Sequence, residues 1–192
     1  MVAEALVERW GLGKAKDRFR GRIAEGRVRI GAPGALGALG IPPVAGEAPR
    51  VAVLCPQTYM NEAGRSVGPA RGALKLGLER VLVVHDEIDL PFGDVRTRLG
   101  GGLAGHNGLK SLKRELGSAD FVRVRVGVGR PNSTDPEIVS AYVLGRFRED
   151  QAQLEELIDN ACEHVERAVV GDGGGQVDTG EPGAGGEPGR GI

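Results

Sequence analysis

Short apolar runs alternate with amphipathic stretches along the chain, a pattern that is typical of an α/β domain. The apolar runs predict buried strands, and alternation of apolar and polar positions predicts strands with one exposed face. Strands are expected at residues 51–54, 81–84, 95–99 and 121–128, with shorter ones at 22–24 and 27–30. Apolar residues at helical spacing predict helices over residues 1–10, 67–76, 108–116 and 149–170, and a further helix that starts at Asp135.

Glycine and proline divide the chain into one domain and a tail. Gly11 and Gly13 end the first predicted helix, and residues 31–49 form a loop rich in glycine, alanine and proline. Residues 171–192 combine glycine, proline and acids without periodicity, so we expect them to be disordered. The predicted organisation is a single α/β domain over residues 1–170 with a mixed or parallel sheet, followed by this tail.

Composition narrows the class of protein. The chain has 192 residues, 40% of them hydrophobic and 27% charged, and no apolar run near the ~20 residues that a membrane span needs. Its two cysteines, Cys55 and Cys162, form no C-x-x-C pair, so neither a zinc site nor a disulfide framework is indicated. Residues 1–10 carry acids and no cleavage site, unlike a signal peptide, and we expect a cytoplasmic protein without a membrane partner.

The net charge of −1 conceals a basic middle segment. From Arg96 to Arg130 there are eight basic residues and two acids, whereas the residues from Pro131 onward include four basic residues and thirteen acids. A basic segment of this kind favours an anionic partner such as a nucleic-acid backbone, although a solvated face has the same composition.

Three polar segments carry the candidate chemistry. Residues 56–61, PQTYMN, follow one predicted strand, and residues 85–91, HDEIDLP, follow another. Residues 100–111, GGGLAGHNGLKS, lead into a predicted helix. Because ligands collect beyond the carboxyl ends of strands in open α/β sheets, these segments are the expected place of a site.

Each candidate residue also has a purely structural interpretation. Asp86 follows four apolar residues, so its carboxylate needs a histidine, arginine or metal partner, unless it caps its own loop. His85 is expected to point away from Asp86, and nothing in the sequence places His106 against it. Asn61 is otherwise a turn residue, and Asn107 is otherwise the cap of the following helix.

Together these segments resemble the bacterial peptidyl-tRNA hydrolases in order and spacing. The resemblance covers residues from about 51 to 147 and rests on PQTYMN, HDEIDLPFG, GGGLAGHNGLKS, FVRVRVGVGRP and YVLGRF. It implies a monomeric α/β protein in which helices flank one twisted mixed sheet. It also implies a hydrolase without metal or cofactor, which cleaves the ester between peptide and tRNA in peptidyl-tRNA and so recycles tRNA during translation.

The resemblance assigns roles to residues at matching positions. Asp86 matches an aspartate that holds a catalytic histidine. Asn61 and Asn107 match asparagines that position substrate and water, and Tyr59 and Met60 match residues that line the substrate site. The expected tRNA phosphate contacts are Arg96, Arg98, Lys110 and Arg125.

One part of the family pattern has no match. The family begins with a strand and an R-H-N-x-G segment that holds the catalytic histidine, whereas this sequence starts after that segment, and His85, His106 and His164 lie elsewhere. We therefore expect translation to start upstream of Met1. Without the first strand and a positioned base, the 192-residue chain is expected to be nearly inactive and poorly stable.

Two other functions remain open. A non-catalytic RNA-binding protein would keep the basic segment without the chemistry of hydrolysis. A nucleotide-binding domain would use the backbone N–H groups of residues 100–108, although this segment lacks the G-K-[ST] ending of a P-loop.

Overall fold

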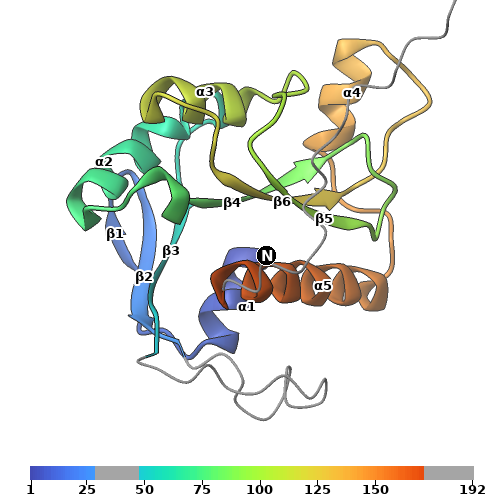
Figure 1. Ribbon diagram of the computed structural model, residues 1–192. Coiled ribbons are helices and arrows are strands. Elements are labelled where there is room, and N and C mark those ends of the chain that lie inside the picture. The colour runs from blue at the N-terminus through green and yellow to red at the C-terminus, as the bar shows by residue number, and fades with distance from the viewer. Residues whose placement is uncertain (29–47, 171–192) are drawn as a thin grey trace, which may run out of the picture.

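The computed structural model describes residues 1–28 and 48–170, which form two three-stranded sheets with helices packed around them (Figure 1). Most of the predicted loop at 31–49 and the tail at 171–192 lie outside the described residues. The strands are β1 (Lys16–Arg18), β2 (Gly21–Arg27), β3 (Arg50–Pro56), β4 (Leu82–Glu87), β5 (Val95–Leu99) and β6 (Val122–Gly127). The helices are α1 (Val2–Arg9), α2 (Gly64–Leu74), α3 (Asn107–Leu116), α4 (Pro136–Val143) and α5 (Gln151–Val170), with single 3₁₀ turns η2 (Met60–Glu62) and η3 (Leu78–Arg80).

The first sheet is antiparallel, with β2 between β1 and β3. Ile23 and Ala24 are adjacent in β2, so their side chains point to opposite faces, and both are buried. α1 packs on the face that carries Ala24 and Val53, and α2 reaches the other face, where Ser66 lies against Gly21. Both faces of this short sheet are therefore covered.

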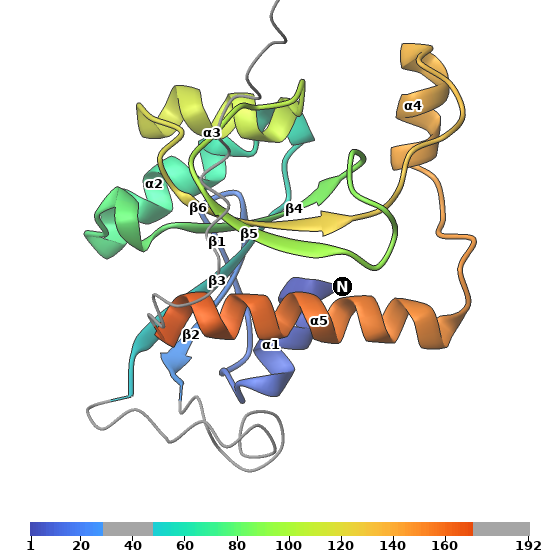
Figure 2. The ribbon, with the colours of Figure 1, turned by 45° about the vertical axis from the view of Figure 1, so that its right-hand side comes forward.

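The second sheet has β6 at its centre, parallel to β4 and antiparallel to β5. Figure 2 shows α3 above this sheet and α5 below it. Leu109, Leu112 and Leu116 of α3 pack on Phe121 and Val81, as their helical spacing predicts. On the opposite face, alternate β6 residues pack against α5 in a cluster that contains Val124, Val126, Leu157, Ala161, Cys162 and Val165.

The α/β class and the mixed strand directions predicted from the sequence are confirmed. The predicted strands at 51–54, 81–84, 95–99 and 121–128 appear as β3, β4, β5 and β6, and the short one at 22–24 lies within β2. The strands form two sheets instead of one twisted sheet, because no strand of the described residues pairs with both β3 and β4. The strand predicted at 27–30 is described only as far as Val28, which follows the end of β2.

Helix boundaries follow local chemistry. α4 starts where predicted, because the Asp135 side chain accepts a hydrogen bond from the N–H of Glu137 and Pro136 occupies the first turn. α1 is tied to α5 by buried Glu166, which accepts from the indole N–H of Trp10 at 2.9 Å and pairs with Arg9 at 3.2 Å. Within residues 1–28 and 48–170, no helix is long and apolar enough to cross a membrane.

Candidate functional site

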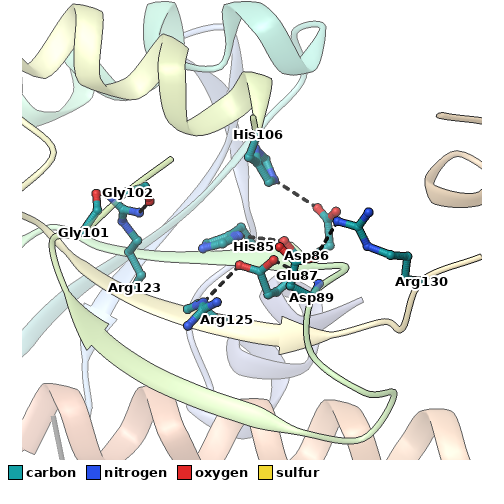
Figure 3. Close-up of polar contacts among 10 residues, drawn as sticks. All are labelled: His85, Asp86, Glu87, Asp89, Gly101, Gly102, His106, Arg123, Arg125 and Arg130. Atoms are coloured by element: carbon teal, nitrogen blue, oxygen red, sulfur yellow. Dashed lines mark hydrogen bonds and ion pairs between the residues drawn. The ribbon is translucent and has the colours of Figure 1, made fainter. Parts of the chain in front are cut away.

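The end of β4 and the start of α3 bring Asp86 and His106 into contact (Figure 3). Nδ1 of His106 accepts hydrogen bonds from the N–H groups of Gly108 at 3.1 Å and Leu109 at 3.3 Å. Since Nδ1 accepts, the neutral ring carries its hydrogen on Nε2, which lies 3.3 Å from Oδ1 of Asp86 and donates to it. His106 is therefore both the cap of α3 and the partner of the Asp86 carboxylate.

This arrangement corrects two expectations. The expectation that nothing places His106 against Asp86 is wrong. The interpretation of Asn107 as the helix cap is also wrong, because His106 caps α3 and Asn107 is its first residue. Asp86 and His106 are twenty positions apart in the chain, and they meet because α3 packs on Phe121 and Val81, a long-range contact that neighbours in sequence do not reveal.

The hydrogen bond from His106 favours the ionised form of Asp86. It is the main cause that lowers the pKa of Asp86 below its ordinary value, against the opposing effect of burial. Asp86 is therefore a carboxylate near neutral pH. Its side chain is 31% exposed, so water or a substrate can reach it.

His85 supports the backbone beside this pair. Its Nδ1–H donates to the carbonyl oxygen of Asp86 at 2.7 Å, so it binds the main chain and not the carboxylate, in line with its predicted orientation. Its ring meets that of His106 edge to face, with centroids 5.0 Å apart. Burial lowers the pKa of His85 to about 4, and its Nε2 is buried without a hydrogen-bond partner among the described residues. His85 is therefore a neutral imidazole near pH 7.

Glu87 is a site residue that the sequence did not single out. Its carboxylate is almost fully buried and accepts from Nε of Arg125 at 3.0 Å and from the N–H of Asp89 at 3.2 Å. An acid that directly follows Asp86 at a strand end was the available signal, but the partner lies on another strand. The Arg125 side chain is 19% exposed, and its charge is balanced by Glu87.

The residues expected to line the substrate site lie in and beside η2, which packs on the start of α3. A Cβ placed on Gly108 would be 2.6 Å from the sulfur of Met60, so η2 packs directly on the start of α3. The N–H of Gly64 adds a hydrogen bond of 3.0 Å to the Ser111 hydroxyl of α3. Tyr59 is 82% exposed. The side chains of Asn61 and Asn107 are also exposed, on these two adjoining segments.

The basic residues of β5 and β6 share one face of the second sheet. Arg96 lies directly opposite Arg125, and Arg98 lies opposite Arg123. Arg123 is buried and donates to the carbonyl oxygens of Gly101 at 3.0 Å and Gly102 at 2.7 Å. Burial lowers the pKa of Arg123, and the neighbouring Arg98 and Arg125 add to the effect. Sequence reasoning counted Arg123 only as part of the basic segment, whereas it holds the glycine-rich loop that leads to His106.

The cations proposed for phosphate contact differ in their exposure and in their ion pairs. Arg96 pairs with Asp94 at 3.6 Å and is 53% exposed, and Lys110 is exposed on α3. Arg98 is half-buried as a residue and lies beside Gly101, where a Cβ added to Gly101 would be 2.7 Å from Cζ of Arg98. Among the described side chains, no three or more histidines, cysteines or acids gather as a metal site requires.

Comparison with known proteins finds similarity to peptidyl-tRNA hydrolases at each level. A family model described as peptidyl-tRNA hydrolase matches residues 1–175. A peptidyl-tRNA hydrolase of Geotalea daltonii is 43% identical over 167 residues, which are 86% of this chain and 76% of that protein. One from Azorhizobium caulinodans is 37% identical over 171 residues, covering 89% of this chain and 74% of that protein.

Solved structures agree with the sequence relatives. A crystal structure of peptidyl-tRNA hydrolase from Acinetobacter baumannii superposes with a TM-score of 0.67 at 31% identity, covering 86% of this chain and 72% of that one. A complex of peptidyl-tRNA hydrolase with n-propanol superposes with a TM-score of 0.68, also at 31% identity, over 88% of this chain and 76% of that one.

Proposed function

The chain belongs to the peptidyl-tRNA hydrolase family, and on this premise we propose that it hydrolyses the ester bond between peptide and tRNA in peptidyl-tRNA. The observation that carries the proposal is the Asp86–His106 pair at the carboxyl end of β4. Such strand ends are where α/β proteins bind ligands, and the resemblance places the aspartate of the family at this position. Freed tRNA then returns to translation.

Asp86 is the proposed orienting carboxylate of the reaction. Ester hydrolysis needs a group that takes a proton from water and a second group that holds it in place. The lowered pKa of Asp86 keeps it ionised, and its side chain is partly exposed beside His106, the residue that precedes Asn107. When the base takes a proton from water it becomes positively charged. An ionised carboxylate beside it stabilises that charge.

The histidines of this chain are poor bases in the conformation described. Both nitrogens of His106 are engaged, one with α3 and one with Asp86. His85 has a free Nε2, but this atom is buried and the pKa of the ring is about 4. His164 lies on α5 and bonds Thr97 at 2.9 Å. Without a well-placed histidine base among the described residues, a rate contribution of ~10²–10⁴-fold is lost, so we expect slow cleavage.

The exposed amides complete the proposed site. Asn61 and Asn107 supply N–H donors on adjoining segments, suited to the oxyanion that forms when water attacks the ester. Tyr59 and Met60 offer an apolar surface for the peptide side of the substrate. The chain is proposed to act as a cytoplasmic monomer without metal or cofactor.

The tRNA backbone is proposed to bind along the basic face of the second sheet. Arg96, Arg98 and Lys110 are assigned to phosphate contacts, since Arg96 and Lys110 are exposed and Arg98 is half-buried. Arg125 is assigned a weaker contact, because Glu87 already accepts from its Nε. The Ala variants of Arg96 and Lys110 should therefore weaken tRNA binding more than the Ala variant of Arg125.

A single-turnover cleavage assay tests this function. The chain, in excess, is incubated with an N-acetylated aminoacyl-tRNA and with a matched tRNA whose amino acid is joined to the ribose through an amide. The hydrolase predicts release of N-acetyl amino acid and intact tRNA from the ester only, faster than without protein. Equal release with and without protein would contradict it.

The same assay addresses the second candidate, an RNA-binding protein without catalysis. The observation in its favour is that none of the three histidines presents an exposed free nitrogen beside Asp86. This candidate predicts equal binding of ester and amide tRNA and cleavage of neither. Binding and cleavage measured on the same samples separate the two functions.

A further inference from the structure

The hairpin formed by β1 and β2 ends in a turn with an unusual sequence. Arg18 pairs with Gly21, which leaves Phe19 and Arg20 as the two turn residues. Their φ angles are 55° and 53°, so both are left-handed. Two-residue hairpin turns with positive φ at both positions favour Asn and Gly, because bulky side chains are strained there. An aromatic residue and a cation thus occupy positions where local geometry disfavours them.

The side chains of this tip form a basic and aromatic surface, for which we use the name hairpin tip (residues 16–20). The guanidinium of Arg18 lies over the Phe19 ring, 4.6 Å from its centroid. The described residues offer no ion-pair partner to Lys16 or Arg20, and both are exposed. Arg18 forms an ion pair with Glu25, with 3.6 Å between Nη1 and Oε1. The tip therefore presents two exposed cations, Lys16 and Arg20, one exposed acid, Asp17, and a flat guanidinium–aromatic stack.

The hairpin tip adjoins the candidate site. The N–H of Gln57 donates to the carbonyl oxygen of Arg20 at 2.9 Å, which fixes the tip to the end of β3 only two residues before Tyr59. A Cβ on Gly21 would lie 3.0 Å from the Ser66 hydroxyl of α2, so the turn is also packed against that helix. Figures 1 and 2 both show the tip beside α2.

We propose that the hairpin tip and Tyr59 bind a single-stranded segment of the tRNA substrate, with Lys16 and Arg20 on phosphates and with bases stacked on the Arg18–Phe19 pair and on Tyr59. This inference rests on the proposed function for the identity of the partner. Aromatic rings and guanidinium planes stack on unpaired bases, which a duplex does not offer. An acidic peptide would use the cations but not the stacking surfaces.

The strained turn allows a test in which binding and stability move in opposite directions. The double variant Phe19→Asn, Arg20→Gly installs the favoured turn pair and removes one stacking ring and one cation. Its melting temperature should equal or exceed that of the wild type, because the left-handed strain is relieved. Arg80→Gln, which removes one exposed charge elsewhere, is the matched control. Arg18→Lys is the second variant, since it keeps the charge and loses the planar group.

The readout is the anisotropy of a labelled short single-stranded RNA and of a duplex of the same sequence. The tip variant should weaken single-strand binding about tenfold and Arg18→Lys about threefold, with duplex binding changed no more than in the control. Single-strand affinity equal to that of the control would overturn the proposal. So would a loss of poly-glutamate binding by Arg18→Lys as large as its loss of single-strand binding, because this variant keeps the charge and an acidic partner would then explain the surface. Because RNA binding is measured without cleavage, a chain that fails to hydrolyse peptidyl-tRNA contradicts the proposed function alone.

Discussion

His106 joins the start of α3 to Asp86 by using one ring nitrogen for each. Substitution by Asn separates these roles, because Asn is a good helix cap but is too short to take the place of Nε2. We expect His106→Asn to change the free energy of unfolding by less than about 1 kcal/mol and to reduce cleavage of peptidyl-tRNA at least tenfold. His106→Ala, which removes the cap too, should cost about 1 kcal/mol more in a urea titration. Equal cleavage by the wild type and His106→Asn would contradict the role of the pair.

His85 makes stability depend on pH. The pKa of His85 is about 4 in the folded protein, whereas the ordinary value for histidine is 6.5. The unfolded chain therefore binds the proton more readily. The stability from the neutral ring is present above pH 6.5 and is lost as pH falls towards about 4. We expect the unfolding free energy of the wild type to fall up to about 3 kcal/mol more than that of His85→Gln over this range. Parallel pH curves for the two proteins would show that the ring is not buried in its neutral form.

A buried ion pair between Arg9 and Glu166 contributes to the contact between α1 and α5. Arg9→Met leaves the Glu166 carboxylate, which is 4% exposed, without its cation. We expect a loss of about 3–5 kcal/mol in unfolding free energy, because a buried charge without a partner is costly. Arg167→Met is the control: its pair with Glu163 is exposed, so it should change stability by less than about 1 kcal/mol. Similar losses in the two variants would show that the Arg9–Glu166 pair does not stabilise the fold more than an exposed pair does.

Arg123 holds the loop that carries His106. Besides Gly101 and Gly102, its guanidinium donates to the carbonyl oxygen of Ala119 at 3.3 Å, and a lysine ammonium cannot reproduce this geometry. Arg123→Lys should lose about 1–3 kcal/mol of stability and increase hydrogen exchange across residues 100–106. The exposed Arg114→Lys should leave both unchanged. Unaltered exchange in Arg123→Lys would mean that the glycine-rich loop is held by other contacts.

The spacing of apolar residues correctly predicted those helices and strands whose apolar side chains pack against the core. The leucines of α3 and the apolar run of β4 gave correct positions, because their burial follows directly from spacing. The two-sheet arrangement was not predicted, because pairing of β2 with β3 spans residues far apart in the chain. Helix capping by a histidine was missed too, since His is an uncommon cap.

The candidate site was predicted residue by residue but not as an assembly. Asp86 was singled out correctly as a carboxylate that needs a partner, and that partner proved to be His106. The buried pair of Glu87 with Arg125 and the loop contacts of Arg123 depend on neighbouring strands and on backbone carbonyls. Such contacts arise from tertiary packing and leave no mark in local sequence.

The role of Asp86 is tested most directly by the single-turnover rate of peptidyl-tRNA cleavage in two matched variants. Asp86→Asn keeps an acceptor for His106 and removes the charge, whereas Asp89→Asn makes the same change at an exposed acid paired with Arg130. We predict that Asp86→Asn lowers the rate at least about 100-fold, or to the uncatalysed rate if that is reached first, while tRNA affinity stays within about twofold. Asp89→Asn should cleave at the wild-type rate. Wild-type cleavage by Asp86→Asn would contradict the account, because the charge of Asp86 would then have no part in the reaction.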